Sequence, residues 1–357
     1  MDNSTFLTNK PVSDPGGWQA LHVFYAASPR PVITQCVEPL IRELTERDLL
    51  DGHFFINYWF GGPHVRIRLK PRSADVCDEI RERAEHHITH FLRTRPALYE
   101  VQETDYLSQF YDVLYELEYS DDEDQKSLAL EDRERFRANN TFSYEPYEPE
   151  YGKYGGGPGV ALAEWHFQRS SDLVMDLTRR MNLHVRTVLL GVSAQLMMVM
   201  STVFRQDATA TAEYLRRYHE FWQDAFTGTK FISEDGYERS YTSMADGLRR
   251  RFTELRRAFD EGTAEALPGF VGAWAAHCAE LRERVTRLAV RGDLTFHAWD
   301  GDGEAPVTDP DEALERLLTP YMHMTNNRLY VTIPDEIYLS YILARALDEP
   351  AAGPVAL

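Results

Sequence analysis

The stretch HFFINYWFGGPHVRIRLK, residues 53–70, predicts a two-stranded antiparallel hairpin around which the rest of the fold is organised. Gly61 and Gly62 tolerate the positive φ values that a tight two-residue turn needs, so the runs on either side should pair. A loop of these two glycines would set three facing pairs across the hairpin, which are Phe60 with Pro63, Asn57 with Arg66, and Phe55 with Arg68.

Alternation along the two strands predicts one apolar face and one polar face. The apolar face, which we expect to be core, holds Phe54, Ile56, Tyr58, Val65, Ile67 and Leu69. The opposite face holds Phe55, Asn57, Trp59, His64, Arg66 and Arg68. At a rise of about 3.3 Å per residue, the two guanidinium groups should lie roughly 7 Å apart. Because arginine keeps its charge, this pair suits a carboxylate or phosphate group; the alternative is a solvated outer face without a ligand.

The composition is typical of a soluble globular protein with room for one large domain or two ordinary ones. The 357 residues are 43% hydrophobic and 27% charged, and no apolar run approaches the roughly 20 residues of a membrane span. The N-terminus lacks a basic start and an apolar segment, so we expect no secretion signal and a cytoplasmic location. The formal charge of −19 disfavours nucleic acid, so any anion site should be a local basic pocket.

The order of the predicted elements is strand, helix, hairpin and then mostly helix, which indicates a helix-rich α+β fold. We expect a flexible N-terminal arm over residues 1–17, a strand over 18–27, helices over 32–50 and 74–95, and an acidic loop at 121–124. A helical bundle should span 182–291, with apolar-periodic segments near 184–204, 208–227, 241–260 and 268–291. A turn over 293–308, two closing helices from 310 and 334, and a tail over 349–357 complete the prediction.

Residues 142–172 carry tyrosines, prolines and a triple glycine without regular periodicity, which predicts an ordered loop leading into a helix near Val160. The glycines lack the GK[ST] sequence of a phosphate loop, and no dinucleotide fingerprint fits, so no cofactor is expected. Three glutamates of this loop, Glu145, Glu148 and Glu150, are candidates for a general base; alternatively they cap and solvate the turn.

Histidines mark two further places in the sequence. His86 and His90 have the i,i+4 spacing of a chelating pair, but no third ligand is evident, so we expect no metal site. Cys36, Cys77 and Cys278 are widely separated, which gives neither a disulfide framework nor a metal-binding spacing. Near the C-terminus, His323 is followed by Asn326, Asn327 and Arg328, which concentrates hydrogen-bond donors beside a titratable imidazole. The alternative for His323 is a core histidine packed beside methionines.

Three separated stretches together resemble the C-terminal domain of lantibiotic dehydratases. They are the hairpin FFINYWFGGPHVRIRL, the loop YEPEYGKYGG with Glu164 and Phe167 downstream, and the segment HMTNNRL. The resemblance implies a single helix-rich α+β domain over residues 18–348 that acts on a ribosomally made precursor peptide carrying a leader. It also implies other biosynthetic enzymes of the pathway as partners, and we keep a homodimer as a candidate assembly.

The motifs of this family imply the site residues. The expected catalytic residues are His323, Arg66, Arg68, Tyr154 and Glu150. The expected substrate-binding residues are Asn57, Trp59, His64, Arg328, Gly155 and Gly156. Lys153 stands where the family motif has arginine, and the motifs imply neither a metal nor another cofactor.

The family has two catalytic branches. One removes glutamate from glutamylated Ser or Thr; the other joins two dehydroalanines in a formal [4+2] cycloaddition and expels water and the leader peptide. Asn57 stands where eliminating members usually have arginine, and Ser170-Ser171 where they usually have Asp-Ser. Loss of an arginine from the polar hairpin face would weaken the grip on a glutamyl carboxylate, so we expect the cyclising branch. Elimination, or a domain that only binds the precursor peptide, is the alternative.

Overall fold

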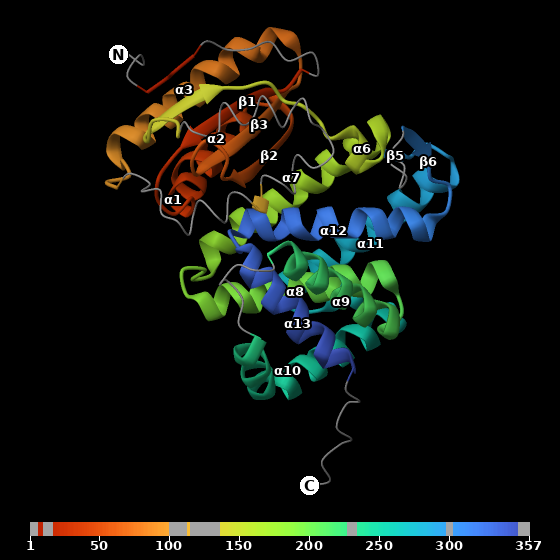
Figure 1. Ribbon diagram of the computed structural model, residues 1–357. Coiled ribbons are helices and arrows are strands. Elements are labelled where there is room, and N and C mark those ends of the chain that lie inside the picture. The colour runs from red at the N-terminus through yellow and green to blue at the C-terminus, as the bar shows by residue number, and fades with distance from the viewer. Residues whose placement is uncertain are drawn as a thin grey trace. The chain divides into compact units, whose positions relative to one another are not determined.

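The computed structural model describes residues 6–9, 17–99, 113–114, 136–226, 234–297 and 303–348 (Figure 1). The chain divides into two compact units, Met1–Pro149 with Ser170–Met181, and Glu150–Arg169 with Asn182–Leu357. The described chain is rich in helix and has one four-stranded and one two-stranded antiparallel sheet, which confirms the predicted α+β class. The predicted acidic loop at 121–124 and the tail at 349–357 lie outside the described residues, and the single domain over 18–348 stays a prediction.

The first unit is built on the four-stranded sheet, whose order is β2-β3-β1-β4. Its strands are β1 (Gln19–Phe24), β2 (Leu50–Tyr58), β3 (His64–Pro71) and β4 (Thr141–Tyr144). Figure 1 shows α2 (Glu38–Glu46) and α3 (Cys77–Thr94) against this sheet. Residues 6–9 belong to the predicted arm, yet Phe6 and Thr8 exchange backbone hydrogen bonds with Phe142, so this part of the arm is bound to β4.

The predicted helices of this unit are confirmed. Their apolar positions are buried, for example Val32, Leu40 and Leu44 in the first helix and Ile80 and Ile88 in the second. The first helix contains a feature that periodicity did not indicate. Between α1 (Arg30–Val32) and α2 the chain makes a π-helical turn over Ile33–Val37, and the predicted apolar residues of that turn remain buried.

The hairpin forms as predicted, but its register differs by one residue. Asn57 pairs with Val65 and Tyr58 with His64, so the loop comprises residues 59–63 rather than the two glycines alone. Gly61 and Gly62 do take positive φ values of 72° and 105°, and the Gly62 N–H donates to the Trp59 carbonyl at 3.0 Å. A one-residue shift turns every side chain of one strand to the other face. The predicted faces are therefore correct for β3 and reversed for β2.

Cross-strand partners define the two real faces of the sheet. The packing face, which meets α3 through Tyr144 and Gln19, holds Leu21, Val23, Phe55, Asn57, Val65, Ile67 and Phe142. The opposite face holds His22, Phe54, Ile56, Tyr58, His64, Arg66, Arg68 and Ser143. Asn57 thus lies on the packing face and not, as predicted, beside Arg66 and Arg68. An arginine at position 57 would not join the charges of that opposite face.

The segment 142–172, predicted as an ordered loop leading into a helix near Val160, contains three regular elements. β4 occupies its start, a short helix α6 spans Tyr151–Tyr154, and the long helix α7 spans Gly156–Arg180. The helix therefore begins four residues earlier than the predicted start near Val160. Gly155 and Gly156 have φ values of 90° and 76° and form the break between α6 and α7, because a residue with a side chain rarely adopts that conformation.

The second unit contains the predicted bundle and closing helices. They are α8 (Arg186–Arg205), α9 (Ala208–Ala225), α10 (Glu234–Asp260), α11 (Phe270–Val290), α12 (Pro310–Leu329) and α13 (Ile333–Asp348). The Asp309 carboxylate accepts the Asp311 N–H at 2.9 Å, which confirms the predicted cap of α12. The predicted turn over 293–308 contains a small hairpin instead, formed by β5 (Thr295–His297) and β6 (Glu304–Pro306).

Helix α8 is the core helix of the bundle, because buried residues lie on several of its faces. It contacts the five other helices of the bundle, α9 to α13. By length and composition alone α8 would also suit a membrane span, with a mean hydropathy of 1.8, which corrects the expectation that no such run exists. Within the protein, 72% of that stretch is buried.

Candidate functional site

The pairing of β1 with β3 assembles a polar cluster in the first unit, which we call the arginine face: His22, His64, Arg66 and Arg68. His22 stands opposite Arg66 in the antiparallel register. His64, Arg66 and Arg68 were predicted to share one face, and they do. His22 was missed, because it belongs to no motif and only the β1–β3 pairing brings it to the arginines.

Each arginine of this face donates a hydrogen bond to a histidine. Arg66 Nε lies 3.2 Å from His64 Nε2, and Arg68 Nη2 lies 3.2 Å from His22 Nε2. Arginine has only donors, so both Nε2 atoms must be acceptors. His64 Nδ1 lies 2.8 Å from the Gly62 carbonyl oxygen, which only accepts, so the proton of this ring is on Nδ1.

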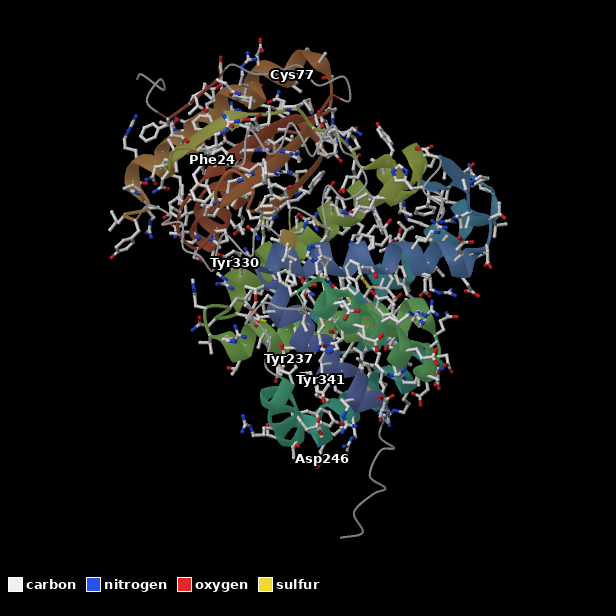
Figure 2. All side chains as sticks on the ribbon, viewed as in Figure 1. Phe24, Cys77, Tyr237, Asp246, Tyr330 and Tyr341 are labelled. Carbon is white, nitrogen blue, oxygen red and sulfur yellow. The ribbon has the colours of Figure 1, made fainter. Side chains whose placement is uncertain are left out.

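Aromatic rings also contact the side chains of the arginine face. The His22 and His64 rings stack with centroids 4.9 Å apart, and Phe24 (Figure 2) lies 4.7 Å from His64. The Arg66 guanidinium lies 3.3 Å from the Tyr58 ring centroid, and the Arg68 guanidinium lies 5.5 Å from that of Tyr147. Cation–π contacts of this kind hold a guanidinium in place without cancelling its charge.

Burial keeps both histidines of the arginine face neutral. It lowers the pKa of His64 to about 3, with the positive charge of Arg66 adding to the effect and the bond to Gly62 opposing it. Burial followed by the charge of Arg68 also lowers the pKa of His22 well below its ordinary value. Near neutral pH the positive charge of the face therefore comes from its arginines. Arg66 is half-buried and Arg68 is 4% exposed.

The two other hairpin residues expected to bind substrate lie elsewhere in the first unit. Asn57 is 7% exposed on the packing face. Trp59 is half-buried in the loop, where its ring lies 5.9 Å from that of Tyr58 and its carbonyl accepts the Gly62 N–H. Trp59 is therefore near one end of the arginine face, and Asn57 is behind it.

In the second unit, His323 is bonded to a buried carboxylate. Its Nδ1 lies 3.1 Å from Glu336 Oε1, and Glu336 also accepts the hydroxyl of Tyr218. Glu336 is fully buried, whereas His323 is partly exposed and lies 5.1 Å from the Trp222 ring. Because an ionised carboxylate only accepts, Nδ1 carries a proton, and Nε2 is the nitrogen that can take or give one. Glu336 was missed because it belongs to a different helix.

Tyr154 and Arg328 belong to an aromatic cluster of the same unit. Tyr154 stacks on Tyr321 at 6.1 Å and meets Phe167 edge-on at 5.4 Å. The guanidinium of Arg328 lies 4.5 Å from the Phe167 ring centroid, and its Nη1 donates to the Met324 carbonyl at 2.7 Å. Burial raises the pKa of Tyr154 well above its ordinary value, and the charge of Glu150 adds to this effect. The Tyr154 hydroxyl is thus kept protonated.

Glu150 and Gly155 have structural explanations. Glu150 is exposed and forms a 2.8 Å ion pair with Lys153 three residues later. A Cβ atom on Gly155 would lie 2.9 Å from the Phe296 ring, so the close approach of α6 to β5 accounts for this glycine.

His166, which no motif indicated, is fully buried, with Nδ1 2.9 Å from His277 Nε2 and its ring 4.7 Å from Tyr321.

Among the described residues, no group of three or more His, Cys, Asp or Glu side chains has the arrangement of a metal site. His86 and His90 stack with ring centroids 6.4 Å apart on the exposed side of α3. The predicted site residues thus form two sets. The hairpin residues belong to the first unit, and the loop residues from 150 onward, His323 and Arg328 belong to the second.

A comparison with protein families places this chain in a defined class. The model of the lantibiotic biosynthesis dehydratase C-terminal domain matches residues 18–347. The chain belongs to this family, as the hairpin, loop and HMTNNRL motifs indicated. A comparison with curated proteins gives no match.

Three solved structures are similar to this chain in fold, each at 18% sequence identity. The pyridine synthase TbtD from thiomuracin biosynthesis has a TM-score of 0.70, over 92% of this chain and 97% of TbtD. TsrL has a TM-score of 0.63, over 93% and 94%. The tRNA-dependent lantibiotic dehydratase MibB from Microbispora sp. 107891 has a TM-score of 0.55, over 95% of this chain but 28% of MibB. These similarities establish the fold.

Proposed function

We propose that this protein modifies a ribosomally made precursor peptide by joining two dehydroalanines in a formal [4+2] cycloaddition, followed by loss of water and the leader peptide. The observation that carries the proposal is the similarity to the pyridine synthase TbtD, in which each chain covers almost the whole of the other. The similarity to the dehydratase MibB, by contrast, extends over only 28% of that protein. We propose that the reaction takes place in the cytoplasm, together with other enzymes of the pathway.

The chemistry asks three things of the protein. Holding both dehydroalanines in one reactive geometry lowers the barrier by roughly 7–11 kcal/mol. A carbonyl oxygen that gains negative charge needs fixed donors, which Arg66 and Arg68 supply. Each later elimination removes a proton from the ring and delivers one to the departing water or leader amide, and this is the role proposed for His323.

The His323–Glu336 pair suits that role. Glu336 holds the proton on Nδ1 and thereby presents Nε2 to a substrate. Tyr154, which burial keeps protonated, is the proposed assisting donor. Glu150 is tied to Lys153 and exposed, so we assign it no part in proton transfer.

Glutamate elimination is the second candidate, and one observation favours it. Because Asn57 lies on the packing face, its difference from the family arginine does not reduce the positive charge of the arginine face. Arg66 and Arg68 together still suit a glutamyl carboxylate.

One experiment separates the two candidates. The purified protein is incubated with a leader-bearing peptide that contains two dehydroalanines and azoles, and, in parallel, with a glutamylated serine peptide. Mass spectrometry should detect the free leader and a pyridine macrocycle from the first peptide. Release of glutamate from the second peptide, with no cyclised product from the first, would show that the protein catalyses elimination and not cyclisation.

A further inference from the structure

Each arginine of the arginine face is bonded to a histidine, and each bond uses the same atom of the imidazole ring. We propose that His22 and His64 are positioning residues, which hold Arg68 and Arg66 in fixed orientations by accepting their N–H groups at Nε2. The effect of this role on catalysis rests on the proposed function. The histidine tautomers that this role requires can be tested without it.

The geometry holds both rings from several sides. Gly62 accepts the His64 Nδ1–H at 2.8 Å, which sets the rotation of that ring. The His22 ring then stacks on His64 with 25° between the planes, and Tyr58 meets His64 edge-on at 5.5 Å. A 180° flip of the His64 ring would break its bond to the Gly62 carbonyl as well as its bond from Arg66. Each guanidinium is held by its bond to a histidine and by an aromatic ring, and Arg68 Nη1 also donates to the Ile67 carbonyl at 3.5 Å.

A histidine acceptor leaves the arginine charge intact, which a carboxylate would not. A carboxylate bonded to Arg66 or Arg68 would cancel most of the field that a substrate oxyanion needs. A neutral imidazole orients the guanidinium and adds no negative charge. The described charged side chains that act most strongly on the two histidines are the cations Arg66, Arg68 and Arg137, which oppose imidazole protonation. On β4, Ser143 opposite His22 donates to Glu145 at 2.6 Å, so this carboxylate already has a hydrogen-bond partner.

The first test reads the tautomers directly. In protein labelled with ¹⁵N-histidine, two-bond ¹H–¹⁵N correlation spectra at pH 7 should show His22 and His64 with Nδ1 protonated and Nε2 bare. The His22→Gln and His64→Gln variants assign the two sets of signals. Protons on both Nε2 atoms would overturn the inference, because a protonated Nε2 donates and cannot accept from arginine.

The second test distinguishes the effect of losing the hydrogen-bond acceptor of His22 from the effect of losing its imidazole ring. Glutamine at position 22 places a carbonyl oxygen near the position of Nε2, whereas leucine fills the space without an acceptor. With the dehydroalanine peptide we expect His22→Gln to keep most of the wild-type kcat/KM, and His22→Leu to lose about 10–100-fold, mainly in kcat. His53→Gln, a buried histidine of the packing face, is the control and should keep wild-type turnover. Equal losses in His22→Gln and His22→Leu would overturn the inference.

A pair of variants at His64 covers the case in which His22→Leu does not fold. His64→Gln keeps the acceptor for Arg66, and His64→Asn keeps instead the donor to the Gly62 carbonyl. We expect the Gln variant to be the more active one, and the reverse order contradicts the inference. If the wild-type protein does not turn over the dehydroalanine peptide at all, the proposed function fails, while the tautomer spectra still decide the roles of His22 and His64.

Discussion

His323 Nδ1 lies 3.1 Å from the Oε1 atom of Glu336, a carboxylate with no exposed surface. The two residues come from neighbouring helices, α12 and α13, and Tyr218 of α9 donates to the same carboxylate. Burying a carboxylate is costly unless hydrogen bonds compensate for its lost hydration. The bond to His323 therefore serves both the stability of the bundle and the orientation of the imidazole.

His323→Ala should slow peptide turnover about 10²–10⁴-fold, because it removes the group proposed to transfer the protons. Glu336→Gln should also slow turnover, since its amide can donate to Nδ1 and thereby place the imidazole proton on Nε2. Single-turnover rates with the dehydroalanine peptide measure both effects. His219→Gln is a suitable control, because His219 on α9 bonds the Ile337 carbonyl at 2.9 Å and has no proposed role in the reaction. Wild-type rates in both test variants would remove His323 from the mechanism.

Arg66→Ala should lower kcat/KM by the equivalent of about 3–4 kcal/mol, the usual cost of losing one positioned donor to an oxyanion. Its effect on the free energy of unfolding should be small because Arg66 is half-buried. Arg68→Ala should lower both quantities, since Arg68 is 4% exposed and its loss leaves a void beside His22. Kinetics combined with urea unfolding separate the two variants, with Lys70→Ala on the same strand as the control. Near-normal turnover in both arginine variants would show that this face is not the active surface.

The neutral state of His64 predicts a dependence of stability on pH. Burial depresses its folded pKa to about 3, so the unfolded chain binds the extra proton first, near pH 6.5. The contribution to stability is full above about pH 6.5 and is lost progressively as the pH falls towards 3, by at most about 1.4 kcal/mol per pH unit. His64→Gln should lose less stability than the wild type between pH 7 and pH 4.5 in urea unfolding. Parallel pH profiles for the two proteins would mean that His64 is not held neutral in the fold.

Gly155→Ala should destabilise the second unit by about 1–3 kcal/mol, because φ is 90° and the added Cβ atom would meet the Phe296 ring. Gly157→Ala is the matched control, since a Cβ atom there meets nothing within 4 Å and alanine favours the helix. Thermal unfolding of both variants measures the difference. If Gly155→Ala keeps full stability and loses activity, the glycine serves the substrate, as the family motif implied, and not the fold.

Helices were predictable from this sequence because their signal is local. Apolar residues at helical spacing identified α2, α3 and the bundle helices, and Asp309 with Pro310 identified the start of α12. Short strands carry less signal, and β4, β5 and β6 were all read as loop or turn. The hairpin register failed for a specific reason. Gly61 and Gly62 fit both a two-residue turn and the observed five-residue loop, and only the pairing partners distinguish the two.

Residues of the candidate site were predictable only where they belong to a sequence motif. Arg66, Arg68 and His64 share a strand, so alternation alone placed them together correctly. His22 and Glu336 join their partners through strand pairing and helix packing across many residues, which no spacing in the sequence indicates. Tyr154, Phe167 and Arg328 were identified by resemblance, yet their contacts with one another and with Tyr321 became apparent only from the fold.

Because the hairpin has a five-residue loop over 59–63, its two strands differ in the substitutions that they tolerate. Arg66 and Arg68 of β3 lie on the face opposite to Asn57 of β2, whose position is constrained by the core instead. Substitutions at position 57 should therefore affect the folding of the first unit more than the choice of peptide substrate. Conversely, a deletion in the loop that shifts β2 by one residue against β3 would move Phe55 off the packing face and Tyr58 onto it, so insertions and deletions should be far less tolerated here than substitutions.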